Sequence, residues 1–155
     1  MARCASGVVV VTTRVGDGDH AMTANSFTSV SLDPPLVLFC VQRDSRFHAA
    51  IQAADRWVVN LLAAEQAAAA RWFAERGRPL AAQMAVVDYS RDADGIALLT
   101  GSMGYLGCAT EAMYPGGDHS IVVGRVDRMV NEDAPATPLV YVDHHLGGPE
   151  YRPGG

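Results

Sequence analysis

The sequence has few cysteines and no excess of positive charge. Its three cysteines, Cys4, Cys40 and Cys108, lie far apart, which argues against a disulfide framework and against paired CxxC metal ligands. We therefore interpret them as ordinary thiols or small buried side chains. Lys and Arg number 12 against 17 Asp and Glu, a formal charge of −5, so no basic surface for nucleic acid is predicted.

Long hydrophobic runs are also missing. The longest ones, for example residues 36–41, are far shorter than the roughly 20 apolar residues that span a bilayer. The opening residues 1–6 lack the charged and apolar regions of a secretory signal. The sequence therefore predicts a cytoplasmic protein that has neither a membrane nor a nucleic acid among its partners.

The motifs of several common chemistries are absent as well. Gly101, Gly104 and Gly107 recur every three residues and do not form the GxGxxG turn of a dinucleotide-binding unit. The chain has no P-loop lysine motif, no GxSxG nucleophile elbow and no HExxH helix. His144 and His145 are adjacent and lack the spacing of metal ligands, so no metal site is predicted.

What the chain does have is the composition of a folded domain. With 155 residues, of which 49% are hydrophobic and 19% charged, it can form one domain with a substantial core. The sequence contains no internal repeat. We expect residues 1–146 to form this domain and residues 147–155 to be a flexible tail.

Runs of apolar and β-branched residues predict a chain dominated by strands. The expected strands cover residues 7–14, 20–23, 36–42, 57–62, 96–99, 105–113, 119–130 and 139–143. Helices are expected over residues 45–54 and over the alanine-rich residues 65–75. Because these helices do not alternate with the strands, the sequence predicts a mainly β fold, a small antiparallel barrel with a few helices.

Two connecting segments have their own signals. Residues 25–33 combine Asn, Ser and Thr with little apolar periodicity, and the prolines that follow remove backbone donors. We expect an ordered polar loop there. The Pro-Gly-Gly-Asp sequence at residues 115–118 predicts a turn between two strands. The pattern of residues 81–94 is weak and predicts only a long connection.

The most distinctive segment is the polar stretch from Met22 to Val37. Its hydroxyl and amide groups, flanked by apolar strands, suit the edge of a flat heteroaromatic ligand. The stretch includes Asp-Pro-Pro, and a Gly-Asp-His sequence occurs later at residues 117–119. On these motifs, and on residues 41–48 and 57–62, the chain resembles the short-chain flavin reductases, which are FMN-binding split-barrel proteins. The resemblance covers about residues 5–143.

The resemblance implies a split β-barrel homodimer that binds FMN or FAD near the subunit interface. It implies that NADH or NADPH is the reductant, and that a flavin-dependent monooxygenase receives the reduced flavin. Two alternatives remain open at this point. One is a split-barrel oxidoreductase that uses a deazaflavin, and the other is a flavin-binding or flavin-storage protein without turnover.

The resemblance also assigns residues to the flavin. They are Met22, Thr23, Ala24, Asn25 and Ser26, then Cys40, Val41 and Gln42 at a strand end, and Ser45, Arg46 and Phe47 at a helix start. Ser45 and Arg46 form a natural phosphate site, because a helix N-terminus favours anions. Purely structural roles are also compatible with these residues. They are a turn at residues 23–26, core packing at residues 40–42, and a helix cap at Ser45 beside a solvated Arg46.

His119 is the candidate catalytic residue. It follows the turn and resembles the family histidine that lies beside the nicotinamide ring and flavin N5. His119 and Tyr141 are therefore expected to contact the nicotinamide nucleotide. Without the resemblance, a single histidine at the start of a strand would be interpreted as structural. The chain departs from the family at residues 142–145, where relatives often carry basic residues.

Overall fold

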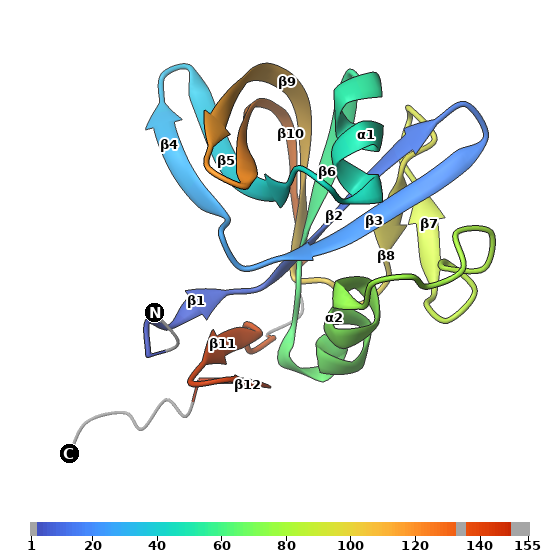
Figure 1. The fold of residues 1–155 in the computed structure, drawn as a ribbon. Coiled ribbons are helices and arrows are strands. Elements are labelled where there is room, and N and C mark those ends of the chain that lie inside the picture. Colours follow the sequence, from blue (N-terminus) through green and yellow to red (C-terminus); the bar gives the residue numbers. More distant parts are fainter. Residues whose placement is uncertain (1–2, 133–135, 150–155) are drawn as a thin grey trace.

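An antiparallel sheet of seven strands, curled into a barrel, makes up most of the molecule (Figure 1). The computed structural model describes residues 3–132 and 136–149. The strands are β1 Ser6–Gly7, β2 Val9–Val15, β3 Gly18–Ala24, β4 Thr28–Leu32, β5 Pro35–Gln42, β6 Arg56–Leu61, β7 Tyr89–Arg91, β8 Ala97–Leu99, β9 Gly104–Gly116, β10 His119–Asn131, β11 Val140–Val142 and β12 His145–Gly147. The large sheet has the order β3-β2-β6-β9-β10-β5-β4, and β1-β11-β12 and β7-β8 form two small sheets. The predicted mainly β fold is confirmed, and its form is a split barrel.

The side chains on the two faces of β2 pack in two different hydrophobic cores. Val9 and Val11 pack inside the barrel, where Trp57 is fully buried. Val10 faces the other way and packs with Phe73. A strand buried on both faces favours apolar side chains at successive positions, which explains the valine run. The buried Thr12 and Thr13 that follow in β2 donate their hydroxyls to the carbonyls of Ala97 and Arg56.

The cysteines are unpaired, as the sequence predicts. Cys4 is exposed, Cys40 is partly exposed and Cys108 is buried, and all three are free thiols. Burial raises the pKa of the Cys108 thiol to about 12, so this side chain acts as a small apolar group in the barrel core.

Two short helices flank β3. Helix α1 covers Arg46–Ala53, and α2 covers Ala67–Ala74 after a 3₁₀ turn at Ala64–Gln66. Ser45 is the N-cap of α1, because its Oγ accepts a hydrogen bond from the backbone N–H of His48 at 3.1 Å. Both predicted helices are thus confirmed. No helix in residues 3–132 and 136–149 has the length and apolarity needed to cross a membrane.

The predicted polar loop over residues 25–33 is wrong in part. Thr28–Leu32 form β4, which pairs with β5 in a hairpin that has a cis peptide bond before Pro34. As the edge strand of the large sheet, β4 keeps most of its side chains exposed. It therefore lacks the apolar run that identifies the buried strands of this chain.

The predicted strand over residues 139–143 is shorter than expected. Asp143 and His144 have φ angles of 48° and 67°, and they form the turn that joins β11 to β12. The domain boundary expected after residue 146 falls inside β12, because Gly147 pairs with Val140. Residues 150–155 of the expected tail lie outside the described residues.

The long β9-β10 hairpin brings His119 to the site described below. Its turn is at Gly117 and Asp118, and Gly117 has a φ of 69°, a left-handed conformation that favours glycine. His119 begins β10 directly opposite Gln42, the last residue of β5. The turn predicted over residues 115–118 is confirmed at Gly117 and Asp118, whereas Pro115 and Gly116 are the last residues of β9.

Candidate active site

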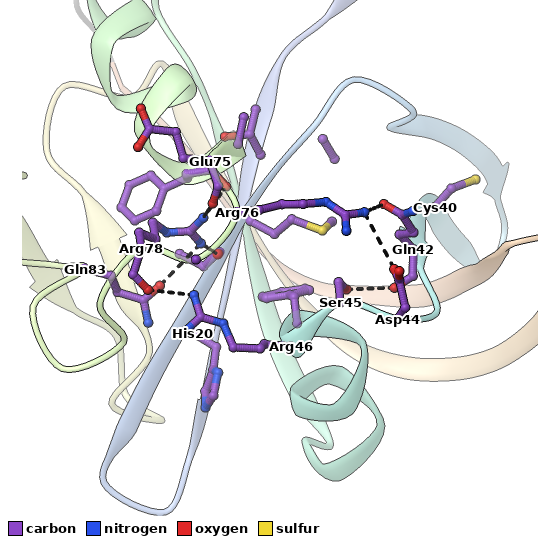
Figure 2. A pocket seen from close by; sticks show the side chains of 18 of the residues that line it. His20, Cys40, Gln42, Asp44, Ser45, Arg46, Glu75, Arg76, Arg78 and Gln83 are labelled. Atoms are coloured by element: carbon purple, nitrogen blue, oxygen red, sulfur yellow. Dashed lines mark hydrogen bonds and ion pairs between the residues drawn. The ribbon is translucent and has the colours of Figure 1, made fainter.

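A cavity of about 590 Å³ opens between β3, the end of β5, the start of α1 and the segment that follows α2 (Figure 2). Its lining residues are His20, Ala21, Met22, Thr23, Ala24, Asn25, Ser26, Cys40, Gln42, Asp44, Ser45, Arg46, Phe47, Phe73, Ala74, Glu75, Arg76, Gly77, Arg78, Leu80, Gln83 and His119. We call it the first cavity. Most of the site residues expected from the sequence lie here, which supports their assignment to one site.

Two expected site residues do not line the first cavity. Val41 is fully buried and packs in the barrel core, because it alternates along β5 with Cys40 and Gln42. Tyr141 lies on β11, in the small sheet with β1 and β12, and its hydroxyl is 3.3 Å from Nδ1 of His144. Neither side chain is part of the wall that a ligand would meet in this chain.

The β3 wall of the cavity is held rigid by its own hydroxyl groups. Thr23 donates from Oγ1 to the carbonyl of Ala70 on α2 at 2.7 Å. Ser26 accepts a hydrogen bond at Oγ from the backbone N–H of Cys40 at 2.9 Å. These bonds tie the wall to α2 and to β5. The segment can therefore present its backbone and the exposed Asn25 side chain to a ligand in one geometry.

One end of the first cavity is cationic. Figure 2 shows Arg46, Arg78 and His20 together there, beside Gln83. The Nη2 atom of Arg46 donates to the carbonyl oxygen of Arg78 at 2.7 Å. Arg78 in turn donates to the carbonyls of Phe73 at 3.0 Å and Glu75 at 2.6 Å, and also to that of Ala21. These contacts fix the two guanidinium groups near each other.

The electrostatics of this end favour a bound anion. Burial, together with the charge of Arg46, lowers the pKa of Arg78. The same two causes lower the pKa of His20, so its imidazole is neutral at pH 7. Among residues 3–132 and 136–149, neither Arg46 nor Arg78 has a carboxylate within 4.0 Å, and the buried Nε of Arg78 has no hydrogen-bond partner. A phosphate would supply the missing negative charge.

A third arginine faces the other side of the cavity. Arg76 donates to the Oε1 atom of Gln42 and lies 3.6 Å from the carboxylate of Asp44 (Figure 2). Because Asp44 balances its charge, Arg76 is a weaker attractor of anions than the pair at the cationic end. The positive charge of the first cavity is thus concentrated near Arg46 and Arg78.

His119 stands at the edge of the first cavity with one ring nitrogen occupied. Its Nδ1 lies 2.7 Å from Oδ1 of Asp118, and this hydrogen bond lowers the pKa of Asp118. Since an ionised carboxylate only accepts, Nδ1 carries the proton, and Nε2 is the ring nitrogen left to accept a hydrogen bond in the neutral tautomer. Nε2 has no hydrogen-bond partner among the described residues.

The backbone around His119 is tied to the start of α1. The N–H of Arg43 donates to the Asp118 carbonyl at 3.0 Å. The next residue, Ser120, shares a hydrogen bond of 2.9 Å with Nε2 of His48 on α1. These contacts keep His119 in a constant position relative to Ser45 and the cationic end.

Several residues of the site were missed in the sequence. They are His20, Asp44 and the segment after α2 that contains Arg76, Arg78, Leu80 and Gln83. The sequence indicated only that Gly77 and Pro79 end a helix there. The available signal was a pair of arginines, Arg76 and Arg78, directly after a helix. Among the described residues, no group of three His, Cys, Asp or Glu could hold a metal ion.

Comparisons with known proteins agree on one family. Residues 1–149 match a family model described as "Flavin reductase like domain". A Streptomyces globisporus NADH-dependent FAD reductase is 45% identical over 123 residues, which is 78% of this chain and 67% of the relative. The reductase component of a 4-hydroxyphenylacetate 3-monooxygenase from Thermus thermophilus is 40% identical over 146 residues, or 91% of this chain and 87% of the relative.

A solved structure supports the same relationship. The NADH:FAD oxidoreductase of Streptomyces globisporus, in complex with NAD and FAD fragments, superposes with a TM-score of 0.88 at 36% identity. The match covers 98% of this chain and 88% of that one.

Proposed function

The chain belongs to the family of flavin reductase like domains, and we propose that it catalyses the NAD(P)H-dependent reduction of FMN or FAD. The reduced flavin is passed to a flavin-dependent monooxygenase, since relatives are named as reductase components of such enzymes. The observation that carries the proposal is the first cavity, where a rigid wall from β3, a cationic end and His119 meet. The cytoplasmic location expected from the sequence stays a prediction.

The residues of the first cavity fit a flavin nucleotide. A volume of about 590 Å³ is within the range of small-molecule sites. Arg46 and Arg78 would hold the phosphate, because both line the cavity and neither has a carboxylate partner within 4.0 Å among the described residues. The backbone of residues 23–26 and the side chain of Asn25 would contact the ring system and the ribityl chain.

The flavin, when bound, supplies N5 as the acceptor of the hydride that leaves C4 of the nicotinamide. The chain's own residues bind and orient the two rings and exclude water from between them. His119 can accept a hydrogen bond at Nε2 from the carboxamide of the nicotinamide, because Asp118 holds the proton on Nδ1. Hydride transfer needs no covalent nucleophile, so buried Cys108 has no part in it.

The proposal is tested by mixing the purified protein with FMN or FAD and with NADH or NADPH, and following nicotinamide absorbance. We expect flavin-dependent oxidation of at least one of the two reductants. Tight flavin binding without oxidation of either reductant would favour the storage alternative. A protein that binds neither FMN nor FAD would contradict the proposal altogether.

The proposal includes a homodimer, supported by the edge strand β4. Leu32 is 92% exposed and Val30 is 50% exposed, and both lie on a strand with one unpaired edge. Exposed apolar side chains on a free edge favour pairing with another copy of the chain.

We expect light scattering of the purified protein to give the mass of a dimer. Leu32→Glu should shift the protein toward the monomer, because a carboxylate in an apolar interface is costly to desolvate. Val86→Glu is the matched control, since Val86 is also exposed, at 58%, and lies on the connection between α2 and β7 instead of on the free edge of β4. A monomeric wild type that still binds flavin tightly would contradict the dimer.

A further inference from the structure

A second cavity, of about 640 Å³, adjoins the first one. It is lined by residues of the β2-β3 turn, of the segment after α2 and of β7, namely Asp17, Gly18, Asp19, Leu80, Ala81, Met84, Ala85 and Tyr89. Leu80 lines both cavities. The side chain of Gln83 lines the first cavity and donates from Nε2 to the carbonyl of Asp19 at 2.5 Å. The wall between the cavities is therefore one residue thick at these points.

This wall stands at the cationic end of the first cavity. His20 follows Asp19 directly on β3, and Arg78 approaches Oε1 of Gln83 from Nη2 at 3.4 Å. Arg46 is bonded to the Arg78 carbonyl at 2.7 Å. Leu80 is two residues beyond Arg78 and lines both cavities, so a ligand whose phosphate lies on these arginines can extend past Leu80 into the second cavity.

The second cavity offers a flat ring a surface for stacking. Tyr89 is 38% exposed and Leu80 is 41% exposed, with Met84 buried beneath them. The guanidinium of Arg91 lies 5.2 Å from the centre of the Tyr89 ring, and it makes two hydrogen bonds of 2.8 Å with the Asp19 carboxylate. An aromatic ring held in this way loses little freedom when a base stacks on it.

The polar groups that line the second cavity provide no cation for a further phosphate. Its lining residues, all within the described part of the chain, include Asp17 and Asp19 and no Lys, Arg or His. Carboxylates repel phosphates, but they accept hydrogen bonds from amino groups and ribose hydroxyls. The preferred occupant is thus an uncharged nucleoside attached to a phosphate in the neighbouring cavity.

We propose that the second cavity binds the adenosine half of a dinucleotide whose phosphates lie on Arg46 and Arg78. The proposal rests on the flavin reductase function stated above. Because the flavin phosphate is placed on these same arginines, FAD is the expected occupant. NADH carries the same adenosine 5′-phosphate and is the alternative that the test separates. Two ligands without an adenosine half distinguish FAD from NADH as the occupant. FMN is the control for FAD, and reduced nicotinamide mononucleotide is the control for NADH.

The test compares Tyr89→Ala with the wild type. We expect FAD to bind about 5- to 30-fold more weakly to this variant, by fluorescence quenching, while the affinity for FMN changes less than about two-fold. Tyr89→Phe retains the ring and should bind FAD like the wild type. Val86→Ala removes an exposed side chain of the same segment that lines neither cavity, and it should leave both affinities unchanged.

The second arm concerns the reductant. A rise of about 5- to 30-fold in KM for NADH, without a rise for reduced nicotinamide mononucleotide, assigns the site to the nicotinamide nucleotide instead. If neither dinucleotide is affected, or if FAD and FMN are weakened equally, the proposal is overturned. Failure of the wild type to bind any flavin is a different result, because it removes the proposed function itself.

Discussion

Arg46→Ala is expected to weaken FMN binding by about 1.5–3 kcal/mol, or about 10- to 150-fold in Kd, measured by fluorescence quenching. Arg46 is part of the cationic end and has only the Arg78 carbonyl as a hydrogen-bond partner among the described residues. Its removal deletes a charge-assisted phosphate contact and leaves the protein's own contacts nearly intact. Arg78 is less suitable for this test, since it also holds the carbonyls of Phe73, Glu75 and Ala21.

Two controls accompany this measurement. Riboflavin has no phosphate, so its affinity should be the same for the wild type and Arg46→Ala. Arg125→Ala removes an exposed arginine that pairs with Glu111 at 3.0 Å, outside the cavity, and it should not change FMN affinity. Equal FMN affinity in the wild type and Arg46→Ala would remove Arg46 from the phosphate site.

His119→Ala is expected to lower the NAD(P)H-dependent rate of flavin reduction by about 10- to 100-fold, roughly 1.4–2.7 kcal/mol of transition-state stabilisation. The variant loses the Nε2 acceptor that Asp118 orients at the cavity edge. No proton passes through a side chain in hydride transfer, so the loss should be partial. Stopped-flow measurement of flavin reduction at saturating flavin would determine the rate.

Flavin affinity and the thermal midpoint should change little in His119→Ala, because the side chain is 41% exposed and packs in neither core. His145→Ala is the matched control, since His145 is also exposed and lies on β12, outside the first cavity. If His119→Ala instead loses flavin or unfolds, while its rate per bound flavin stays normal, the histidine is structural.

Residues whose roles depend on their neighbours along the chain were predictable. The valine run alone is enough to predict that β2 is a strand buried on both faces. The role of Ser45 as an N-cap depends only on the helix that directly follows it. The turn at Gly117 depends only on a left-handed conformation that glycine adopts readily. Strand alternation alone would also have placed Cys40 and Val41 on opposite faces of β5.

The sequence by itself therefore determined the mainly β architecture, the two helices, and half of the residues that line the first cavity. Its polar stretch and its Gly-Asp-His turn were specific enough to indicate the flavin reductase family, which the comparisons then established. The edge strand β4 escaped prediction, because an exposed strand leaves little apolar pattern in the sequence.

Only the tertiary structure decided the cationic end of the site. Arg46 and Arg78 are 32 positions apart, and Arg78 reaches a carbonyl on β3 that is 57 positions away. Tyr141 was separated from the cavity in the same way, by the pairing of β11 with β1. The electrostatic field at a binding site depends on which charges long-range packing brings together and on how deeply it buries them. No local pattern along the chain contains that information.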